Sequence, residues 1–185
     1  QVERVNYDQN INARLIVNGL GGSDAFTADD NSSTTTLDGG DGDDYFQIGQ
    51  VFGTPRNTDA GITAGDTFTT TPVIIGVIRN PLNNEVIFDP AEDALTDAVK
   101  AQISQAISDS GDDPLDGIAY LSDGVTFATT AFGGEGEDTF SVYRNVGVLR
   151  LEGENGNDEF IVRAFVILEG LLQAETEVLG GNGED

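Results

Sequence analysis

The chain alternates between short runs of β-forming residues and glycine-rich polar loops. Runs with alternating apolar positions stand directly before a loop at residues 14–17, 34–37, 148–151 and 176–179. Others follow a loop at residues 45–48, 139–142 and 159–162. Short runs rich in branched and aromatic residues, bounded by Gly, Asn and Asp, are typical of β-strands. The pattern predicts an all-β framework in which one strand enters and one strand leaves each loop.

The interval 53–123 interrupts this alternation and is expected to form an insertion. Two of its β-forming runs, Pro72–Arg79 and Glu85–Phe88, are separated by the turn-rich segment 80–84. Two such runs joined by a turn predict a β-hairpin. The framework is therefore expected to comprise three parts: β coils over 1–52, the insertion over 53–123, and further coils over 124–185.

A helix is expected within the insertion, over residues 90–109. Asp89 can cap it, Pro90 suits the first helical position, and Gly111 can end it. Its apolar residues recur at helical spacing and are expected to pack on the hairpin or the coils, with binding of a partner as the alternative: Leu95, Val99, Ile103, Ala106 and Ile107. An acidic group follows that does not match the EF-hand pattern: Asp109, Asp112, Asp113 and Asp116. A solvated loop is expected there, with a separate weak cation site as the alternative.

One glycine-rich motif recurs along the chain, as a tandem repeat. Its fullest copies read Gly-Gly-x-Gly-x-Asp-x-Phe, and all five copies occupy residues 19–26, 39–46, 133–140, 153–160 and 180–185. Leu20 and Glu154 replace the second glycine in two of them. Asp24 and Asp44 are 20 residues apart. Repetition at a fixed period predicts stacked structural units rather than isolated turns.

The motif suits a hard cation. Glycines allow positive φ angles that turn carbonyl oxygens toward one point, and each aspartate adds a carboxylate. Calcium takes six to eight oxygen ligands, which two successive loops can supply together. The apolar position after each aspartate is expected to point into the coil, so that its side chains stack as a ladder: Phe26, Phe46, Phe140 and Phe160.

These repeats resemble the RTX (hemolysin-type) nonapeptide G-G-x-G-x-D-x-U-x, where U is a large apolar residue. The resemblance implies a parallel β-roll or β-solenoid in which several Ca²⁺ ions lie between the loops of neighbouring coils. It gives as metal-site residues Gly19, Gly22, Asp24, Gly39, Gly40, Asp41, Gly42, Asp43, Asp44, Gly133, Gly134, Glu135, Gly136, Glu137, Asp138, Gly153, Asn155, Gly156, Asn157, Asp158, Gly180, Gly181, Asn182, Gly183 and Asp185.

The chain departs from that family in repeat density. RTX arrays run nonapeptides back to back, whereas here one motif occurs in each coil of about 20 residues. The half-coil between motifs is generic, as in the turn at residues 145–147. We therefore expect a single ladder of calcium sites along one edge of the coils, with ordinary turns on the other edge.

The charge and composition of the chain limit the kinds of molecule that it can bind. Acidic residues number 33 against 8 basic ones, giving a net charge of −25, which disfavours nucleic acid and anionic membranes. A diffusely acidic surface of the halophilic kind would explain that charge, but the regular register of the aspartates favours specific sites. Histidine and cysteine are absent, which excludes typical zinc sites, thiolate nucleophiles and Ser-His-Asp triads. No apolar run is long enough to span a membrane.

The sequence thus predicts a non-enzymatic, calcium-binding structural or adhesive module that folds when Ca²⁺ binds. The resemblance implies a large secreted protein, or a filament, at the cell surface. Joining the last motif to Gln1 and Val2 completes a copy, so end-to-end contact with flanking repeats or neighbouring copies is expected, with surface glycans or other cells as further partners. The alternative is a carbohydrate-active β-helix enzyme, such as a polysaccharide lyase using Ca²⁺, but the only lysine is Lys100 and the arginines are scattered.

Overall fold

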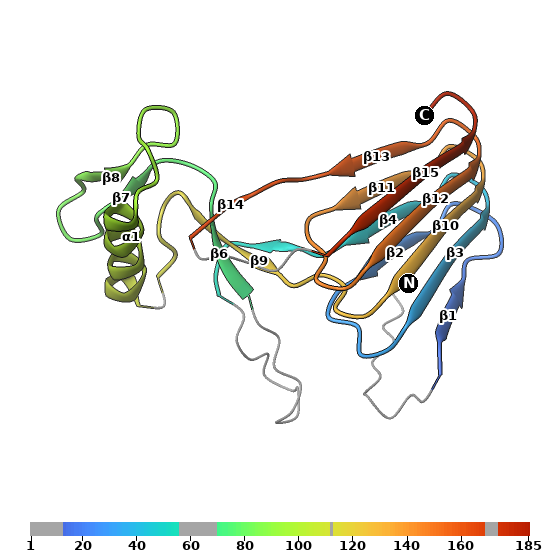
Figure 1. Ribbon diagram of the computed structural model, residues 1–185, viewed down its shortest axis with the longest axis horizontal. Helices are drawn as coiled ribbons and strands as arrows, with labels where there is room; N and C mark the ends of the chain where they lie inside the picture. Colours follow the sequence, from blue (N-terminus) through green and yellow to red (C-terminus); the bar gives the residue numbers. More distant parts are fainter. Residues whose placement is uncertain (1–12, 56–69, 112, 169–173) are drawn as a thin grey trace. The chain divides into compact units, whose positions relative to one another are not determined.

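The computed structural model describes residues 13–55, 70–111, 113–168 and 174–185. The chain forms two compact units (Figure 1). Unit 1 comprises the described parts of 1–50, 123–163 and 172–185, and unit 2 those of 51–122 and 164–171. The expected motif completion at Gln1 and Val2 lies outside the described residues.

Unit 1 is built from two parallel sheets (Figure 1). The first has the spatial order β1 (Leu15–Asn18), β3 (Thr35–Asp41), β10 (Thr129–Glu135), β12 (Leu149–Asn155) and β15 (Thr176–Asn182). The second has the order β2 (Ala25–Ala28), β4 (Tyr45–Ile48), β11 (Thr139–Val142) and β13 (Glu159–Val162). Along the chain the strands alternate between the sheets. A strand of the first sheet, the glycine-rich loop after it and any following strand of the second sheet together form what we call a rung.

Neighbouring rungs pair in one continuous register. Leu37 lies opposite Val17 in β1 and opposite Ala131 in β10. Strands β3 and β10 flank the insertion in sequence, yet they pair directly, as do β4 and β11. The rungs that precede and follow the insertion in the sequence are therefore neighbours in the stack.

The core of unit 1 lies between the two sheets. Its fully buried residues include Phe46, Ile48, Phe140, Val142, Leu149 and Leu151. The predicted phenylalanine ladder is confirmed, because the rings of Phe26, Phe46, Phe140 and Phe160 form one stack with centroids 4.9, 4.7 and 4.9 Å apart. Aromatic pairs in this distance range stabilise beyond the area they bury.

Buried asparagines anchor the edge of unit 1 opposite the glycine-rich loops. The Asn31 amide donates to the Ser33 carbonyl at 2.9 Å and accepts from the N–H groups of Thr126 and Phe127 in the next rung. Asn145 repeats the first contact, donating to the Gly147 carbonyl at 2.9 Å. Asn145 also donates to the Glu175 carbonyl, directly before β15, at 3.2 Å. Each amide therefore shapes its own turn and also satisfies the backbone that leads into the next rung.

Unit 2 contains an antiparallel sheet with the order β14 (Val166–Ile167), β6 (Thr70–Ile74), β9 (Ile118–Ser122) and β5 (Val51–Phe52). The predicted hairpin is only partly correct. The pairing is confined to β7 (Ile78–Arg79) and β8 (Val86–Phe88), because the start of the first run belongs to β6 and pairs with β9. Residues 164–168, expected in the coils, also belong to this unit through the β14 pairing.

The single helix among the described residues, α1, spans Asp97–Ser110 and begins later than predicted. Thr96 is its N-cap and accepts from the Val99 N–H, while Asp89 instead closes a separate turn by accepting from the Ala91 N–H. Gly111 ends the helix as expected. The predicted apolar stripe lies in the core of unit 2, with Ile103 and Ala106 fully buried. Nowhere in the described chain is a helix long and apolar enough to cross a membrane.

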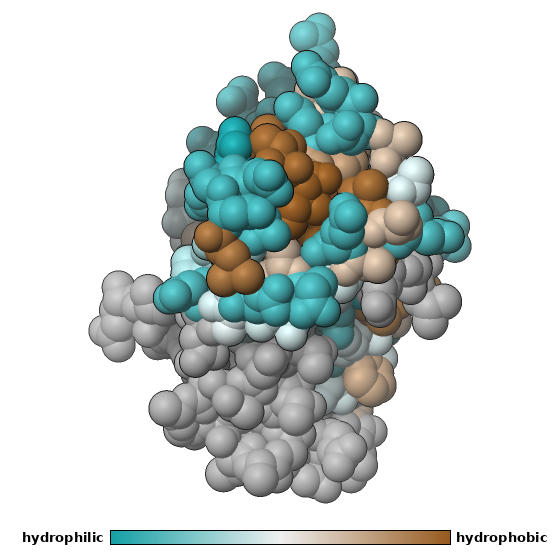
Figure 2. All heavy atoms as spheres, turned by 90° about the vertical axis from the view of Figure 1, so that its left-hand side faces the viewer, coloured by the Kyte–Doolittle hydropathy of each residue, from teal (hydrophilic) through white to brown (hydrophobic). Residues whose placement is uncertain are grey.

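Figure 2 looks onto unit 2, where hydrophobic side chains gather between hydrophilic ones. Among the described residues of this unit, the large exposed hydrophobic ones are Ile75, Leu82, Val86 and Val166. A shallow groove of about 280 Å³ lies between β8 and α1 and is lined mainly by amides and carboxylates, among them Glu85, Gln102, Gln105 and Asp109. Asp113 and Asp116 are exposed, as expected for a solvated loop.

Candidate cation site

The motif aspartates of unit 1 form a hydrogen-bonded ladder, one per rung. In each step the backbone N–H of one aspartate donates to Oδ1 of the aspartate in the next rung. The pairs and N···O distances are Asp24 to Asp44 at 2.7 Å, Asp44 to Asp138 at 2.8 Å, Asp138 to Asp158 at 2.9 Å and Asp158 to Asp185 at 3.1 Å. The ladder occupies Oδ1 of Asp44, Asp138, Asp158 and Asp185 and leaves Oδ2 of each as the available oxygen.

Three of these Oδ2 atoms are buried without a partner. Asp44, Asp138 and Asp158 are 2%, 1% and 5% exposed, and their Oδ2 atoms have no hydrogen-bond partner among the described residues. The ion pairs found in the described part of unit 1 use other carboxylates, those of Asp123, Glu152 and Glu177. A buried, uncompensated carboxylate is strongly unfavourable, so each of these groups calls for a cation or a proton.

Each Oδ2 lies in a small space that the first glycine of its motif keeps open. A Cβ atom added to Gly39 would fall within 3.0 Å of both Asp44 Oδ2 and the carbonyl oxygen of Gly133 in the next rung. The same arrangement recurs at Gly19, Gly133 and Gly153. We call each such space an oxygen niche. Two oxygens from neighbouring rungs converge there because the glycine has no side chain.

The aspartate pKa values reflect this burial. Desolvation raises the pKa of Asp138 from 3.8 to about 6, and the neighbouring carboxylates of Asp158 and Asp44 add to the rise. Burial also raises the pKa values of Asp44 and Asp158. In each case a backbone N–H opposes the shift without cancelling it. The ionised ladder is therefore electrostatically unfavourable as it stands.

The other predicted site residues divide into two groups. The third and fifth motif positions form exposed columns that hydrogen-bond from rung to rung, for example Glu137 N–H to Asp43 Oδ1 at 3.0 Å and Asn155 Nδ2 to Glu135 Oε1 at 2.8 Å. They lie at the loop surface: Asp41, Asp43, Glu135, Glu137, Asn155, Asn157 and Asn182. At the second and fourth motif positions the backbone of one rung packs directly on the backbone of the preceding rung. A Cβ atom added there would clash with a carbonyl oxygen of the preceding rung at Gly40, Gly42, Gly134, Gly136, Gly156, Gly181 and Gly183. Gly22 has open space.

The second motif position favours glycine for its backbone. Gly40, Gly134 and Gly181 have φ angles of 97°, 109° and 113° there, while Leu20 and Glu154 are held at 78° and 73°. A residue with a Cβ pays about 1–2 kcal/mol for a left-handed conformation. Burial also raises the pKa of Glu154, as do nearby carboxylates, chiefly that of Glu152.

We expect Glu154→Gly to raise the free energy of unfolding by about 1 kcal/mol, because it removes this strain. Urea denaturation in calcium measures it. Glu154→Ala is the matched control, since it removes the same charge but keeps the Cβ. Equal stabilisation by both variants would show that charge, not backbone strain, is the cause.

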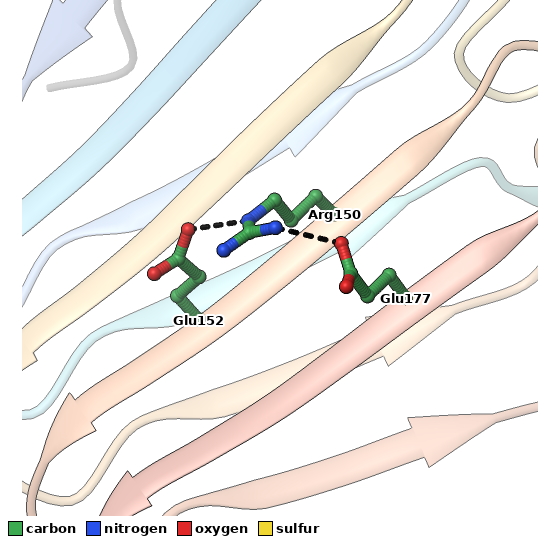
Figure 3. A network of polar contacts seen from close by, with 3 residues as sticks. All are labelled: Arg150, Glu152 and Glu177. Atoms are coloured by element: carbon green, nitrogen blue, oxygen red, sulfur yellow. Dashed lines mark hydrogen bonds and ion pairs between the residues drawn. The ribbon is translucent and has the colours of Figure 1, made fainter.

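A basic residue on the first sheet, Arg150, forms ion pairs with two glutamates. Arg150 on β12 bonds Glu152 Oε1 through Nε at 2.5 Å and Glu177 Oε2 through its terminal nitrogen at 2.7 Å (Figure 3). Arg150 and Glu177 are register partners on β12 and β15. The arginine therefore links two rungs on the surface and leaves the motif aspartates uncompensated.

Sequence patterns did not indicate two features of this unit. One is the aspartate-to-backbone ladder, which needs the register between rungs. The other is the pair of buried asparagines, although Asn31 precedes Asp44 by the same number of residues as Asn145 precedes Asp158. No group of three or more Asp, Glu, His or Cys side chains suited to a metal occurs among the described residues. Backbone carbonyls would therefore have to supply much of any coordination shell.

The chain was compared with protein-family models, with curated proteins and with solved structures, and none of the three comparisons gives a match.

Proposed function

We propose that unit 1 is a calcium-stabilised structural module of the RTX type, with its rungs wound as a parallel β-roll. The observation that carries this proposal is the set of buried Oδ2 atoms of Asp44, Asp138 and Asp158. Each lies near a carbonyl from the next rung and has no hydrogen-bond partner in the described part of the chain. The niches offer only oxygen donors, which suits calcium rather than zinc or copper.

The donor set fits the ion. The niches would be formed by Asp24 with the Gly39 carbonyl, Asp44 with Gly133, Asp138 with Gly153, and Asp158 with Gly180. Bound Ca²⁺ would supply the positive charge that these buried carboxylates lack. The two oxygen donors of a niche belong to two neighbouring rungs, so ion binding favours the stacked state over the unfolded chain. The free energy of binding therefore contributes to folding.

This coupling suits a protein that folds outside the cell. With a net charge of −25, the chain repels itself when no cation is bound. Extracellular calcium would close the niches and stack the rungs, so we propose a secreted or cell-surface structural or adhesive role without catalysis. Membership of the RTX group and export as an unfolded chain belong to the same proposal.

A calcium titration followed by circular dichroism tests the proposal. We expect millimolar Ca²⁺ to increase the β-sheet signal and the melting temperature, and EDTA to reverse both. The triple variant Asp44→Asn, Asp138→Asn, Asp158→Asn should lose the response, because it keeps Oδ1 as an acceptor but removes the buried charge.

The control carries the same charge change in unit 2: Asp97→Asn, Asp109→Asn, Asp113→Asn. It should respond to calcium like the unmodified chain. A second arm replaces calcium by molar NaCl in EDTA. If salt alone produced the full gain, charge screening of a halophilic kind would explain the result and the site proposal would be wrong.

A further inference from the structure

The groove between β8 and α1 in unit 2 gathers polar side chains that the calcium proposal does not use (Figure 1). Its helical wall is formed by Gln102, Gln105, Ala106 and Asp109. Spacings of three and four residues place these side chains on one face of the helix. Ala106 is buried in the core of unit 2, whereas the two glutamines and Asp109 are exposed. The helix therefore presents a row of polar side chains along the border of that core.

The wall formed by β8 and the turn before it adds an amide, a carboxylate and an apolar surface. Asn80 and Glu85 are the first and last residues between β7 and β8, and the Asn80 N–H donates to the Glu85 carbonyl at 2.8 Å. Val86, which is 50% exposed, and the half-buried Ile87 follow them. All four residues line the groove. The groove thus combines three side-chain amides and two carboxylates with exposed aliphatic surface.

Hydrogen bonds within the chain hold several of these polar side chains in place. Gln105 Nε2 donates to Asp109 Oδ1 at 2.8 Å, which leaves Gln105 Oε1 to accept from a ligand. Asn80 Oδ1 accepts from a backbone N–H two residues on at 2.9 Å, which leaves Nδ2 to donate. Glu85 Oε2 accepts from Asn83 Nδ2 at 2.9 Å and leaves Oε1 to accept. Because these side chains are already ordered, a ligand that binds them loses less conformational entropy.

The charges and donor types of the groove indicate the class of ligand. Its described lining contains Glu85 and Asp109 and no basic residue, in a chain of net charge −25, so an anionic group would be repelled. Amides donate and accept in one plane and carboxylates accept, which together match hydroxyl groups, since a hydroxyl does both. Side chains three residues apart on a helix are separated by about 5–6 Å, so Gln102 and Gln105 can reach different hydroxyl groups of one ring.

We propose that this groove binds a neutral saccharide, with the amides and carboxylates on its hydroxyl groups and Val86 against the C–H face of a ring. A volume of about 280 Å³ is small for a ligand pocket, so one or two sugar rings fit. None of the described lining residues is aromatic, so stacking adds nothing and the dissociation constant should be millimolar. The groove contains none of the oxygen niches, so this inference goes beyond the calcium role.

An NMR titration of the nitrogen-15-labelled chain tests the site and the class of ligand. The probes are the neutral disaccharides maltose, cellobiose and lactose, the anionic sugar glucuronic acid, and the cationic peptide triarginine, all added in calcium. We expect at least one disaccharide to shift the side-chain amide signals of Gln102 and Gln105 and the backbone signal of Val86, with saturation at millimolar concentration. Glucuronic acid should bind at least tenfold more weakly, because the groove carries two carboxylates.

The double variant Gln102→Ala, Gln105→Ala should weaken disaccharide binding at least tenfold, measured on the backbone signal of Val86. Both glutamines are exposed and alanine favours helix, so the variant should keep the melting temperature of the unmodified chain. Ser104→Ala, exposed on the same helix but outside the groove, is the matched control and should bind normally.

Three results would overturn the saccharide site: no disaccharide shifts these signals, the double variant binds as tightly as the unmodified chain, or triarginine shifts the same signals at lower concentration than any disaccharide. The last result would assign the groove to a basic peptide. Disaccharide binding by a chain whose folding does not respond to calcium would overturn the proposed function alone and leave the saccharide site standing.

Discussion

Replacing Gly133 with alanine should lower the free energy of unfolding in calcium by about 3 kcal/mol and weaken calcium binding at least tenfold. The new methyl group would lie within 3.0 Å of Asp138 Oδ2 and of the Gly153 carbonyl. Real Cβ atoms do not approach so closely, so the loop has to shift, and overpacking of this kind costs about 1–3 kcal/mol. The shift also separates the two oxygens that would hold the ion. Urea denaturation and calcium titration measure the two effects.

Gly21→Ala is the matched control for this substitution. Gly21 belongs to a motif copy too, but its added Cβ would lie 3.6 Å from the nearest atom, which is ordinary contact. We expect a change in unfolding free energy within about 0.5 kcal/mol and unchanged calcium affinity. If Gly133→Ala were as mild as Gly21→Ala, the niche could not be the place where the oxygens are held.

Without calcium, the protein should be more stable at pH 4.5 than at pH 7.5. The pKa of Asp138 is 3.8 in its ordinary state and about 6 when folded, so the folded chain holds this proton more tightly. Such a group adds stability that is full below about pH 4 and is lost as the pH rises through 6. The raised pKa values of Asp44 and Asp158 act in the same direction. Thermal unfolding in EDTA across this range measures the effect.

The effect of Asp138→Asn on the free energy of unfolding should have opposite signs with and without calcium. Its amide keeps Oδ1 for the Asp44 N–H and can donate to the Gly153 carbonyl without carrying charge. In EDTA at pH 7.5 we expect it to be more stable than the unmodified chain by about 2–3 kcal/mol, the size of the pKa shift it removes. In calcium it should be less stable. If Asp138→Asn destabilised the chain under both conditions, the buried charge would not be the source of the pH dependence.

The rungs of unit 1 were predictable because each one repeats the same short sequence pattern. Glycines mark the loops, and the fixed distance from aspartate to phenylalanine places every ring in one row. The parallel pairing of strands and the phenylalanine stack follow from that register. The finer prediction of a closed β-roll stays a proposal.

Unit 2 was less predictable because its pairings are set by distant partners. The run from Pro72 reads as one strand, but its first part pairs with β9 and only Ile78 and Arg79 pair with β8. The helix start was misplaced because Asp89 and Thr96 are both competent caps. Only packing of the apolar stripe decides between them.

The residues of the candidate site could be predicted from the motif, but which of their side chains are buried could not. The spacing identified the aspartates and glycines, and the structure separates Asp44 and Asp138, which are buried, from Asp43 and Glu137, which are exposed. That separation depends on which face of the loop meets the next rung. A single rung carries no such information.

The direct pairing of β3 with β10 also bears on how the chain can fold. The other steps of the aspartate ladder join partners 20 or 27 residues apart, whereas Asp44 and Asp138 meet across 94 residues. Loop-closure entropy grows only with the logarithm of length, so this step costs about 1.4 kcal/mol more than a neighbouring one. The two halves of the stack can therefore nucleate separately and merge late, and the merging step should set the folding rate. Shortening the insertion should speed folding while leaving the unfolding rate nearly unchanged.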